Sequence, residues 1–187
     1  MKREDLYETI RPLFEQGVIT RFRDIFLYVA ESTIAADLGK KTDRFKELID
    51  HIDQYTVEEI VLMGSLIRLS FGEMIQLIIP DYPAVEAPLP VEKNNLYKSV
   101  KAMYLEGKVL SFSDIFKYIK VSIVAKDVKK NRSTLSKSIK KSGIKKFPLG
   151  PLVAIGNFCD LTLTETLKLV EAEYIKQTTQ KTSLSSE

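Results

Sequence analysis

The chain has 187 residues, of which 44% are hydrophobic, enough for a folded core in one large domain or two small ones. No apolar run reaches the roughly 18–20 residues that cross a bilayer, and the charged N-terminus (MKREDLYETI) lacks the apolar stretch of a secretory signal. The single cysteine, Cys159, and single histidine, His51, cannot form an intrachain disulfide or a typical zinc site. We therefore expect a cytoplasmic protein that is not an enzyme, with no membrane segment, metal, cofactor or catalytic residue.

Charge is divided unevenly between the two halves of the chain. Residues 1–90 hold 10 Lys+Arg and 16 Asp+Glu, a net charge of −6, whereas residues 91–187 hold 18 Lys+Arg and 9 Asp+Glu, a net charge of +9. From Lys117 to Lys146 there are eleven basic residues and one acid, Asp127. This asymmetry indicates that the halves have different partners and that the basic half contacts a polyanion such as nucleic acid.

The first half of the chain is repeated in the second. The 33 residues from Leu6 align with the 33 residues from Leu96, and eleven positions are identical: Leu6/Leu96, Tyr7/Tyr97, Gly17/Gly107, Phe22/Phe112, Asp24/Asp114, Ile25/Ile115, Phe26/Phe116, Tyr28/Tyr118, Ser32/Ser122, Ala35/Ala125 and Asp37/Asp127. With a two-residue shift, LSFGEMIQLI aligns with LTLTETLKLV. The length and order of the match predict a tandem duplication.

Each repeat reads as a series of short helices. Apolar residues at i, i+4, i+7 and i+8 from Leu6 predict a helix that ends near Gly17, and Gly107 holds the same position in the second repeat. A second apolar stripe runs from Phe22 to Val29, and a third from Val61 to Ile67. Three later segments have the spacing of a capping box: Thr56–Glu59, Ser70–Glu73 and Thr162–Glu165. Because no segment alternates like a strand, we predict an all-α fold of two tandem helical domains.

Proline and polar composition set the expected boundaries. We assign residues 1–79 to an acidic N-terminal repeat, 80–93 to a Pro-rich linker that contains four of the seven prolines, and 94–176 to a basic C-terminal repeat. The polar tail, 177–187, is predicted to be disordered.

The middle of each repeat has a helix–turn–helix pattern, STIAADLGKKTDRFKELI in the first and VSIVAKDVKKNRSTLSKSI in the second. Both resemble the lambda-repressor-like, XRE-type helix–turn–helix family, and the two tandem domains are expected to share its fold. Ala35 and Ala125 match the family's small residue at the helix crossing, and Gly39 matches its turn glycine, where a positive φ is expected. Lys129 replaces that glycine in the second repeat.

The second helix of each motif carries the family's buried positions. Phe45, Leu48 and Leu135 match them, whereas Ser138 stands where a large side chain is usual and Ile139 can substitute for it. Ile34 and Leu38, and in the second repeat Val124 and Val128, are expected around the crossing.

The resemblance implies that the second helix of the C-terminal motif lies in the major groove of double-stranded DNA. We expect base contacts from Arg132, Ser133, Thr134, Ser136 and Lys137, because arginine and lysine donate to guanine and hydroxyls bond either way. We expect phosphate contacts from Ser122, Lys126, Lys129, Lys130, Asn131, Lys140, Lys141, Lys145 and Lys146, with Asn131 as the N-cap. The alternative interpretation is a lysine-rich helix that is merely solvated.

The corresponding face of the N-terminal repeat has the opposite character. It holds two bases, Arg44 and Lys46, against four acids, Asp43, Glu47, Asp50 and Asp53, and a net −2 face is repelled by phosphates. We expect this repeat to fold against the C-terminal one, to form a homodimer or to hold a protein partner. Its acidic face could also compete with DNA for the basic face.

The remaining conspicuous residues have structural interpretations. Asp24 and Asp114 are expected to cap a helix, the recurring aromatic residues and Cys159 to lie in the core, and His51 to lie at a helix end.

The pattern as a whole predicts a sequence-specific DNA-binding protein, a prokaryotic transcriptional regulator that uses the C-terminal recognition helix. The alternative is a protein–protein interaction module that keeps the helix–turn–helix fold without binding DNA. RNA binding would share the charge pattern. A single chain could act alone, or two chains could bind half-sites one helical turn apart.

Overall fold

The computed structural model describes residues 3–83, 95–140 and 143–184. The chain divides into two compact units, Met1–Ala84 (unit 1) and Val85–Glu187 (unit 2). All regular structure within the described ranges is helical, so the protein is all-α.

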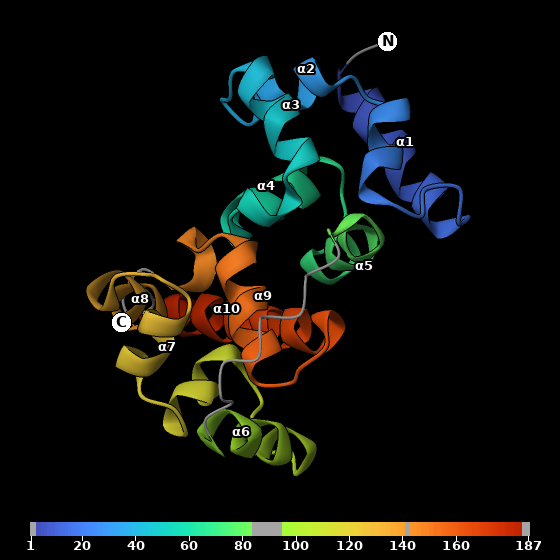
Figure 1. The fold of residues 1–187 in the computed structure, drawn as a ribbon. Coiled ribbons are helices and arrows are strands. Elements are labelled where there is room, and N and C mark those ends of the chain that lie inside the picture. The colour runs from blue at the N-terminus through green and yellow to red at the C-terminus, as the bar shows by residue number, and fades with distance from the viewer. Residues whose placement is uncertain (1–2, 84–94, 141–142, 185–187) are drawn as a thin grey trace. The chain divides into compact units, whose positions relative to one another are not determined.

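Unit 1 is a series of short helices (Figure 1) whose buried apolar side chains form its core. In chain order they are α1 (Arg3–Glu15), the 3-10 helix η1 (Phe22–Leu27), α2 (Glu31–Asp37), α3 (Thr42–Asp50), the 3-10 turn η2 (Ile52–Gln54), α4 (Val57–Leu66) and α5 (Phe71–Asp81). The stripe that begins at Phe22 thus forms a 3-10 helix, with Phe22 and Ile25 in the core.

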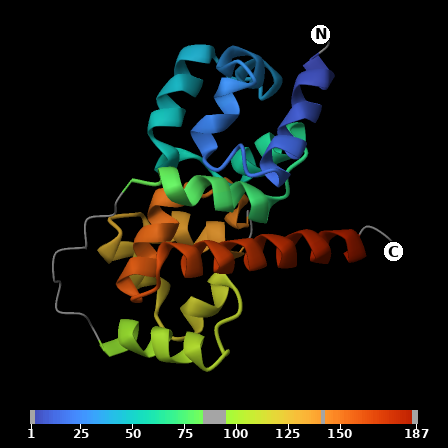
Figure 2. The same cartoon turned by 90° about the vertical axis from the view of Figure 1, so that its right-hand side faces the viewer.

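Unit 2 has the same order of elements. They are α6 (Asn95–Leu105), η3 (Phe112–Lys117), α7 (Val121–Asp127), α8 (Arg132–Lys140), η4 (Ile144–Lys146), α9 (Leu149–Phe158) and α10 (Leu163–Leu184). The main difference is at the end, where α10 has 22 residues and its counterpart α5 has 11. Figure 2 shows α10 as one uninterrupted helix.

Capping residues set where the helices begin and end. The three predicted capping boxes are confirmed: for example, Glu59 N donates to Thr56 Oγ1 (3.2 Å) and Thr56 N donates to Glu59 Oε2 (2.8 Å). Gly17 and Gly107 have φ angles of 69° and 71° just after α1 and α6. This left-handed conformation ends a helix and is accessible to glycine without strain, as predicted.

Residues that are identical in the two repeats hold the first helix of each unit in place. The Tyr7 hydroxyl donates to Asp37 Oδ2 (2.6 Å) at the end of α2, and Tyr97 donates in the same way to Asp127. Asp24 accepts from Thr20 N and Arg21 N, and Asp114 from Leu110 N and Ser111 N, which confirms both aspartates as caps.

The structure corrects the predicted boundaries. Pro80 and Asp81 complete α5 and Tyr82 is buried, so unit 1 continues into the segment assigned to the linker; residues 84–93 of that segment lie outside the described residues. The prediction of a disordered tail is wrong for 177–184, which form the end of α10. Tyr28 is also not a core residue, since 39% of its surface is exposed.

Two single residues lie where the sequence predicts. Cys159 is fully buried, and burial raises the pKa of its thiol to about 12, so it is a core residue. His51 is exposed at the end of α3. No single helix in the described ranges is both long and apolar enough to cross a membrane; α4 and α5 reach that length only jointly and are bent by 111° at the break.

Candidate nucleic-acid interface

The turns between α2 and α3 and between α7 and α8 have the same backbone. Gly39 has φ 65° and the next amide, Lys40 N, donates to Ala35 O (2.8 Å). Lys129 has φ 51° and Lys130 N donates to Ala125 O (2.8 Å). The positive φ predicted for Gly39 is confirmed. Lys129 adopts the same left-handed conformation at a cost of roughly 1–2 kcal/mol, and its side chain is exposed on the turn.

The buried side of each helix pair follows the predicted pattern. Ala35 and Ala125 are buried at the crossing, and Phe45 and Leu135 are buried on the inner faces of α3 and α8. Ile139 is half-buried beside Leu135; the side chain of Ser138 lies outside the described residues. The outward side of α8 is therefore fixed by the burial of Leu135.

Asn131 begins α8 as an N-cap. Its Oδ1 accepts from Ser133 N (2.8 Å) and from the Ser133 hydroxyl (2.7 Å), which confirms the predicted cap. The first turn of α8 contains no acid, so the positive end of the helix dipole faces solvent without a neutralising carboxylate. In unit 1 the corresponding residue is Lys41, whose side chain makes no capping bond.

The five residues predicted to contact bases all lie on α8. Arg132, Ser133, Thr134 and Lys137 are exposed, whereas Ser136 is half-buried. The structure thus brings four of the five onto accessible surface and places Ser136 at its edge.

The residues predicted to contact phosphates lie on both sides of this surface. Ser122, Lys126, Lys129, Lys130, Asn131 and Lys146 are exposed. Lys145 is half-buried, with its ammonium group 5.0 Å from the centre of the Tyr174 ring, a cation–π contact. The side chain of Lys140 and all of Lys141 lie outside the described residues.

Four of the cations around α8 have no acid partner among the described residues. In the described part of the chain, Lys126, Lys129, Lys130 and Arg132 form no ion pair. In unit 1, by contrast, Lys40 pairs with Glu59 of α4. The residue aligned with Glu59 in unit 2 is Pro151, which leaves the aligned lysine, Lys130, exposed.

Two acids of α3, Glu47 and Asp50, form ion pairs with basic residues. Arg44 Nη1 lies 2.9 Å from Glu47 Oε2, and Arg23 Nη2 lies 3.3 Å from Asp50 Oδ1. Because the exposed acids outnumber the bases on this helix, the face of α3 is unsuited to a phosphate backbone.

The sequence analysis did not predict the residues that join α10 to η3 and η4 beside α8. Glu173 Oε2 accepts from Ser113 N (3.1 Å), Gln177 Nε2 donates to Glu173 Oε1 (2.7 Å), and Ile144 N donates to Gln177 Oε1 (3.0 Å). Burial alone raises the pKa of Glu173, but the hydrogen bonds from Ser113, Ser111 and Gln177 outweigh it and hold the pKa below its ordinary value. These bonds join α10 to η3 and to η4, which carries Lys145.

A signal for Glu173 was present in the alignment. Asp81 of unit 1 aligns with Glu173 by the same two-residue shift as the capping boxes, and Asp81 Oδ2 accepts from Arg23 N (2.9 Å) as Glu173 does from Ser113 N. An acid that recurs at the aligned position could therefore have predicted the contact between the last helix and η3.

Comparison of the chain with known protein families, with characterised proteins and with solved structures gives no significant match. The charge and geometry of α8 and its surroundings are therefore the basis for proposing a function.

Proposed function

We propose that the protein binds double-stranded DNA through α8 and acts as a sequence-specific transcriptional regulator of the prokaryotic helix–turn–helix type. The observation that carries the proposal is the contrast between α8 and α3. Each helix follows a turn with the same backbone and buries the same aligned position on its inner side. On α8, however, Arg132, Ser133 and Lys137 are exposed. The aligned residues of α3 are Thr42, Asp43 and Glu47.

In this proposal α8 lies in the major groove with its N-terminal half nearest the bases. The Arg132 guanidinium is suited to bidentate donation to guanine O6 and N7, and the hydroxyls of Ser133 and Thr134 are short enough for close approach. Lys126, Lys129 and Lys130 on one side and Lys146 on the other supply phosphate contacts, which position the helix without reading sequence.

The first test is a salt titration of duplex binding with the whole chain. Contacts to about five or six phosphates should give a slope near −5 in a plot of log affinity against log salt. Absence of binding to any duplex at low salt would contradict the proposal. Selection of bound fragments from genomic DNA would identify the operator.

The second test separates base contacts from phosphate contacts. We expect Arg132→Ala to cost about 1–3 kcal/mol at one base pair and to relax specificity there. Lys146→Ala should weaken binding to all sequences alike and reduce the salt slope by about 1. Lys145→Ala should act in the same uniform way, but less strongly, because Tyr174 holds its ammonium group.

Arg44→Ala on α3 is the matched control, because Arg44 of unit 1 aligns with Thr134 on α8. It should leave affinity and specificity unchanged. An effect of Arg44→Ala equal to that of Arg132→Ala would show that α8 is not the reading helix.

A protein–protein interaction module is the second candidate function, and exposed apolar side chains of unit 1 favour it. Leu27 is 78% exposed and Val18 is 48% exposed, and Tyr28 adds aromatic surface. Unit 1 would then hold a protein partner or a second copy of the chain. Leu27→Glu should abolish self-association measured by light scattering if a second copy binds there, and leave the DNA affinity per chain unchanged.

A further inference from the structure

The 3-10 turn η4 follows α8 and carries Lys146, which is exposed, and Lys145, which is half-buried. Its first residue, Ile144, is buried, and the turn packs against both α8 and α10. Gly143 precedes the turn with a φ of 69°, and a Cβ there would lie 2.1 Å from Gln177 Oε1. Glycine at this position therefore allows α10 to approach the start of the turn closely.

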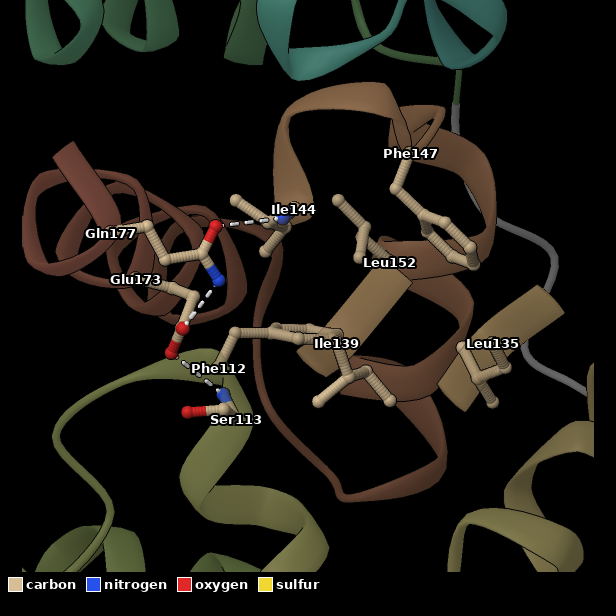
Figure 3. Close-up of a pocket in the computed structure, with 9 residues that line it drawn as sticks. All are labelled: Phe112, Ser113, Leu135, Ile139, Ile144, Phe147, Leu152, Glu173 and Gln177. Atoms are coloured by element: carbon tan, nitrogen blue, oxygen red, sulfur yellow. Dashed lines mark hydrogen bonds between the residues drawn. The ribbon is translucent and has the colours of Figure 1, made fainter. Parts of the chain in front are cut away.

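Two contacts from α10 hold η4. Gln177 Oε1 accepts from Ile144 N (3.0 Å), and Gln177 Nε2 donates to the Glu173 carboxylate (2.7 Å), as Figure 3 shows. The amide of Gln177 thus joins the first residue of the turn to a side chain that is only 4% exposed. The second contact is made by the Lys145 ammonium group, which lies 5.0 Å from the centre of the Tyr174 ring.

The counterpart of this turn in unit 1 lacks its positive charge. In the alignment with the two-residue shift, η2 carries Asp53 and Gln54 where η4 carries Lys145 and Lys146. Gln54 Oε1 accepts from Arg44 Nη2 of α3 (3.4 Å). The same scaffold therefore presents an acid and an amide beside α3, and two lysines beside α8.

The last helix differs between the units at the same place. Asp81, the residue aligned with Glu173, ends α5, whereas α10 continues past Glu173 to Leu184. Gln177 and its hydrogen bond to η4 belong to this additional part of α10. The longer helix and the basic turn therefore occur together, in the unit whose α8 face is also basic.

We propose that Gln177 is a positioning residue for DNA binding. With the contact between Tyr174 and Lys145 as a second tether, it holds η4 so that Lys146 contacts the phosphate backbone while α8 lies in the major groove. A turn that is fixed before binding avoids the entropy cost of ordering it in the complex. This inference rests on the proposed DNA binding, because Lys146 has no phosphate to contact without it.

The test is a substitution that removes the tether without changing the charge. Gln177→Met keeps the length of the side chain but loses both amide hydrogen bonds. It should imitate Lys146→Ala: affinity for a labelled duplex that the wild-type chain binds should fall about three- to tenfold, and the slope of log affinity against log salt should become smaller by about 1. A neutral change that only unfolds part of the protein lowers the active fraction and leaves the slope unchanged, so the slope separates positioning from stability.

Hydrogen exchange measures the tether in the full chain without DNA. The Ile144 amide should exchange at least about tenfold faster in Gln177→Met than in the wild type, whereas the aligned Ile52 amide of unit 1 should be unchanged. Thr179→Ala alters an exposed residue on the same part of α10 and is the matched control, which should change neither the exchange of Ile144 nor the DNA affinity. Gln177→Ala removes the same two hydrogen bonds and is the second variant if Gln177→Met fails to fold.

A combined variant shows whether Gln177 acts through Lys146. Once Lys146→Ala has removed the charge, adding Gln177→Met should weaken DNA binding by less than about twofold, since two residues that act through one contact are not additive. A further fall as large as that in the single Gln177→Met variant would overturn the positioning role.

The outcomes separate this inference from the proposed function. If the wild-type chain binds no duplex at low salt, DNA binding fails and the role of Gln177 fails with it. If the wild type binds but Gln177→Met keeps its affinity and salt slope, DNA binding stands and the positioning role is overturned. Faster exchange at Ile144 with an unchanged slope would also overturn it, because α10 would then hold η4 for the stability of unit 2 alone.

Discussion

The two units of this chain keep the same internal ties and differ in what they expose. Tyr7–Asp37 and Tyr97–Asp127 join the first helix to the end of the third element, and Arg11–Glu73 and Lys101–Glu165 join it to the last helix. The exposed faces of α3 and α8, in contrast, carry opposite charge. The comparison teaches that a duplicated scaffold can retain its tethers while the exposed charge of one copy is reversed.

The cores also differ beneath these two helices. Under α3 the ring of Phe45 makes edge-to-face contacts with Phe26 and Tyr55, whereas Leu135 and Phe147, aligned with Phe45 and Tyr55, border a small cavity under α8. The Tyr55 hydroxyl in unit 1 is buried without a hydrogen-bond partner in the described structure, and burial raises its pKa further above its ordinary value. Phe147 at the aligned position has no such hydroxyl. The residues at and beneath α8 therefore differ from those at and beneath α3 on the buried side as well as on the exposed side.

The largest expected effect comes from giving α8 the charges of α3. The double variant Ser133→Asp with Lys137→Glu places the acids of Asp43 and Glu47 at their aligned positions. We expect DNA affinity to fall by at least 100-fold, about 2.7 kcal/mol, because two carboxylates would face the phosphate backbone. Fluorescence anisotropy with a labelled duplex measures the loss.

The reciprocal variant, Asp43→Ser with Glu47→Lys on α3, is the control for a general charge effect. It adds the same amount of positive charge elsewhere on the chain and should raise affinity less than tenfold. A rise as large as the fall on α8 would mean that net charge, not the position of α8, determines binding.

The next effect concerns a glycine that both units share. A Cβ at Gly64 would lie 2.7 Å from Leu69 O, a backbone atom, whereas a Cβ at Gly156 would overlap the Thr166 side chain. We expect Gly64→Ala to destabilise unit 1 by about 2.5 kcal/mol, because a backbone carbonyl moves aside less easily than a side chain. Urea unfolding monitored by circular dichroism gives the value.

The same substitution in unit 2 should respond to a second change. Gly156→Ala is expected to cost about 2 kcal/mol, and Thr166→Ala should recover part of that cost by removing the overlapping atoms. If Met74→Ala rescues Gly64→Ala equally well, the side chain of Met74 rather than the Leu69 carbonyl is the obstacle.

A smaller effect separates the two turns. Lys40 and Glu59 form a pair in which the side chains are only 23% and 22% exposed, whereas Lys130 has no described acid partner. Lys40→Met keeps most of the apolar stem and should cost up to about 1 kcal/mol of stability, and Lys130→Met less than about 0.5 kcal/mol. Equal costs in thermal unfolding would show that the Lys40–Glu59 pair adds nothing to unit 1.

The smallest effect is a pH dependence that belongs to unit 2. The pKa of Glu173 is lower in the folded protein than its ordinary value of 4.5, so its ionised form stabilises the fold above pH 4.5. That contribution is lost as the pH falls below 4.5 through the folded pKa. Glu173→Gln should therefore lower stability at pH 7 and flatten the decline of unfolding free energy below pH 4.5, as urea titrations at pH 7 and pH 3.5 would measure. A variant with the wild-type pH dependence would show that Glu173 is not the group responsible.

The amino-acid sequence by itself determined the all-α class, the repeated order of elements, the capping boxes, the positive φ at Gly39 and the burial of Leu135. These features depend on residues a few positions apart, where helical spacing and single-residue geometry decide the outcome. Only the tertiary structure decided that α10 continues to Leu184, that Glu173 and Gln177 tie it to η3 and η4, that Lys145 lies on Tyr174, and that a cavity remains under α8. Those features depend on side chains from distant parts of the chain meeting in space, and a local pattern such as the polar run after Gln177 does not reveal which surface it will meet.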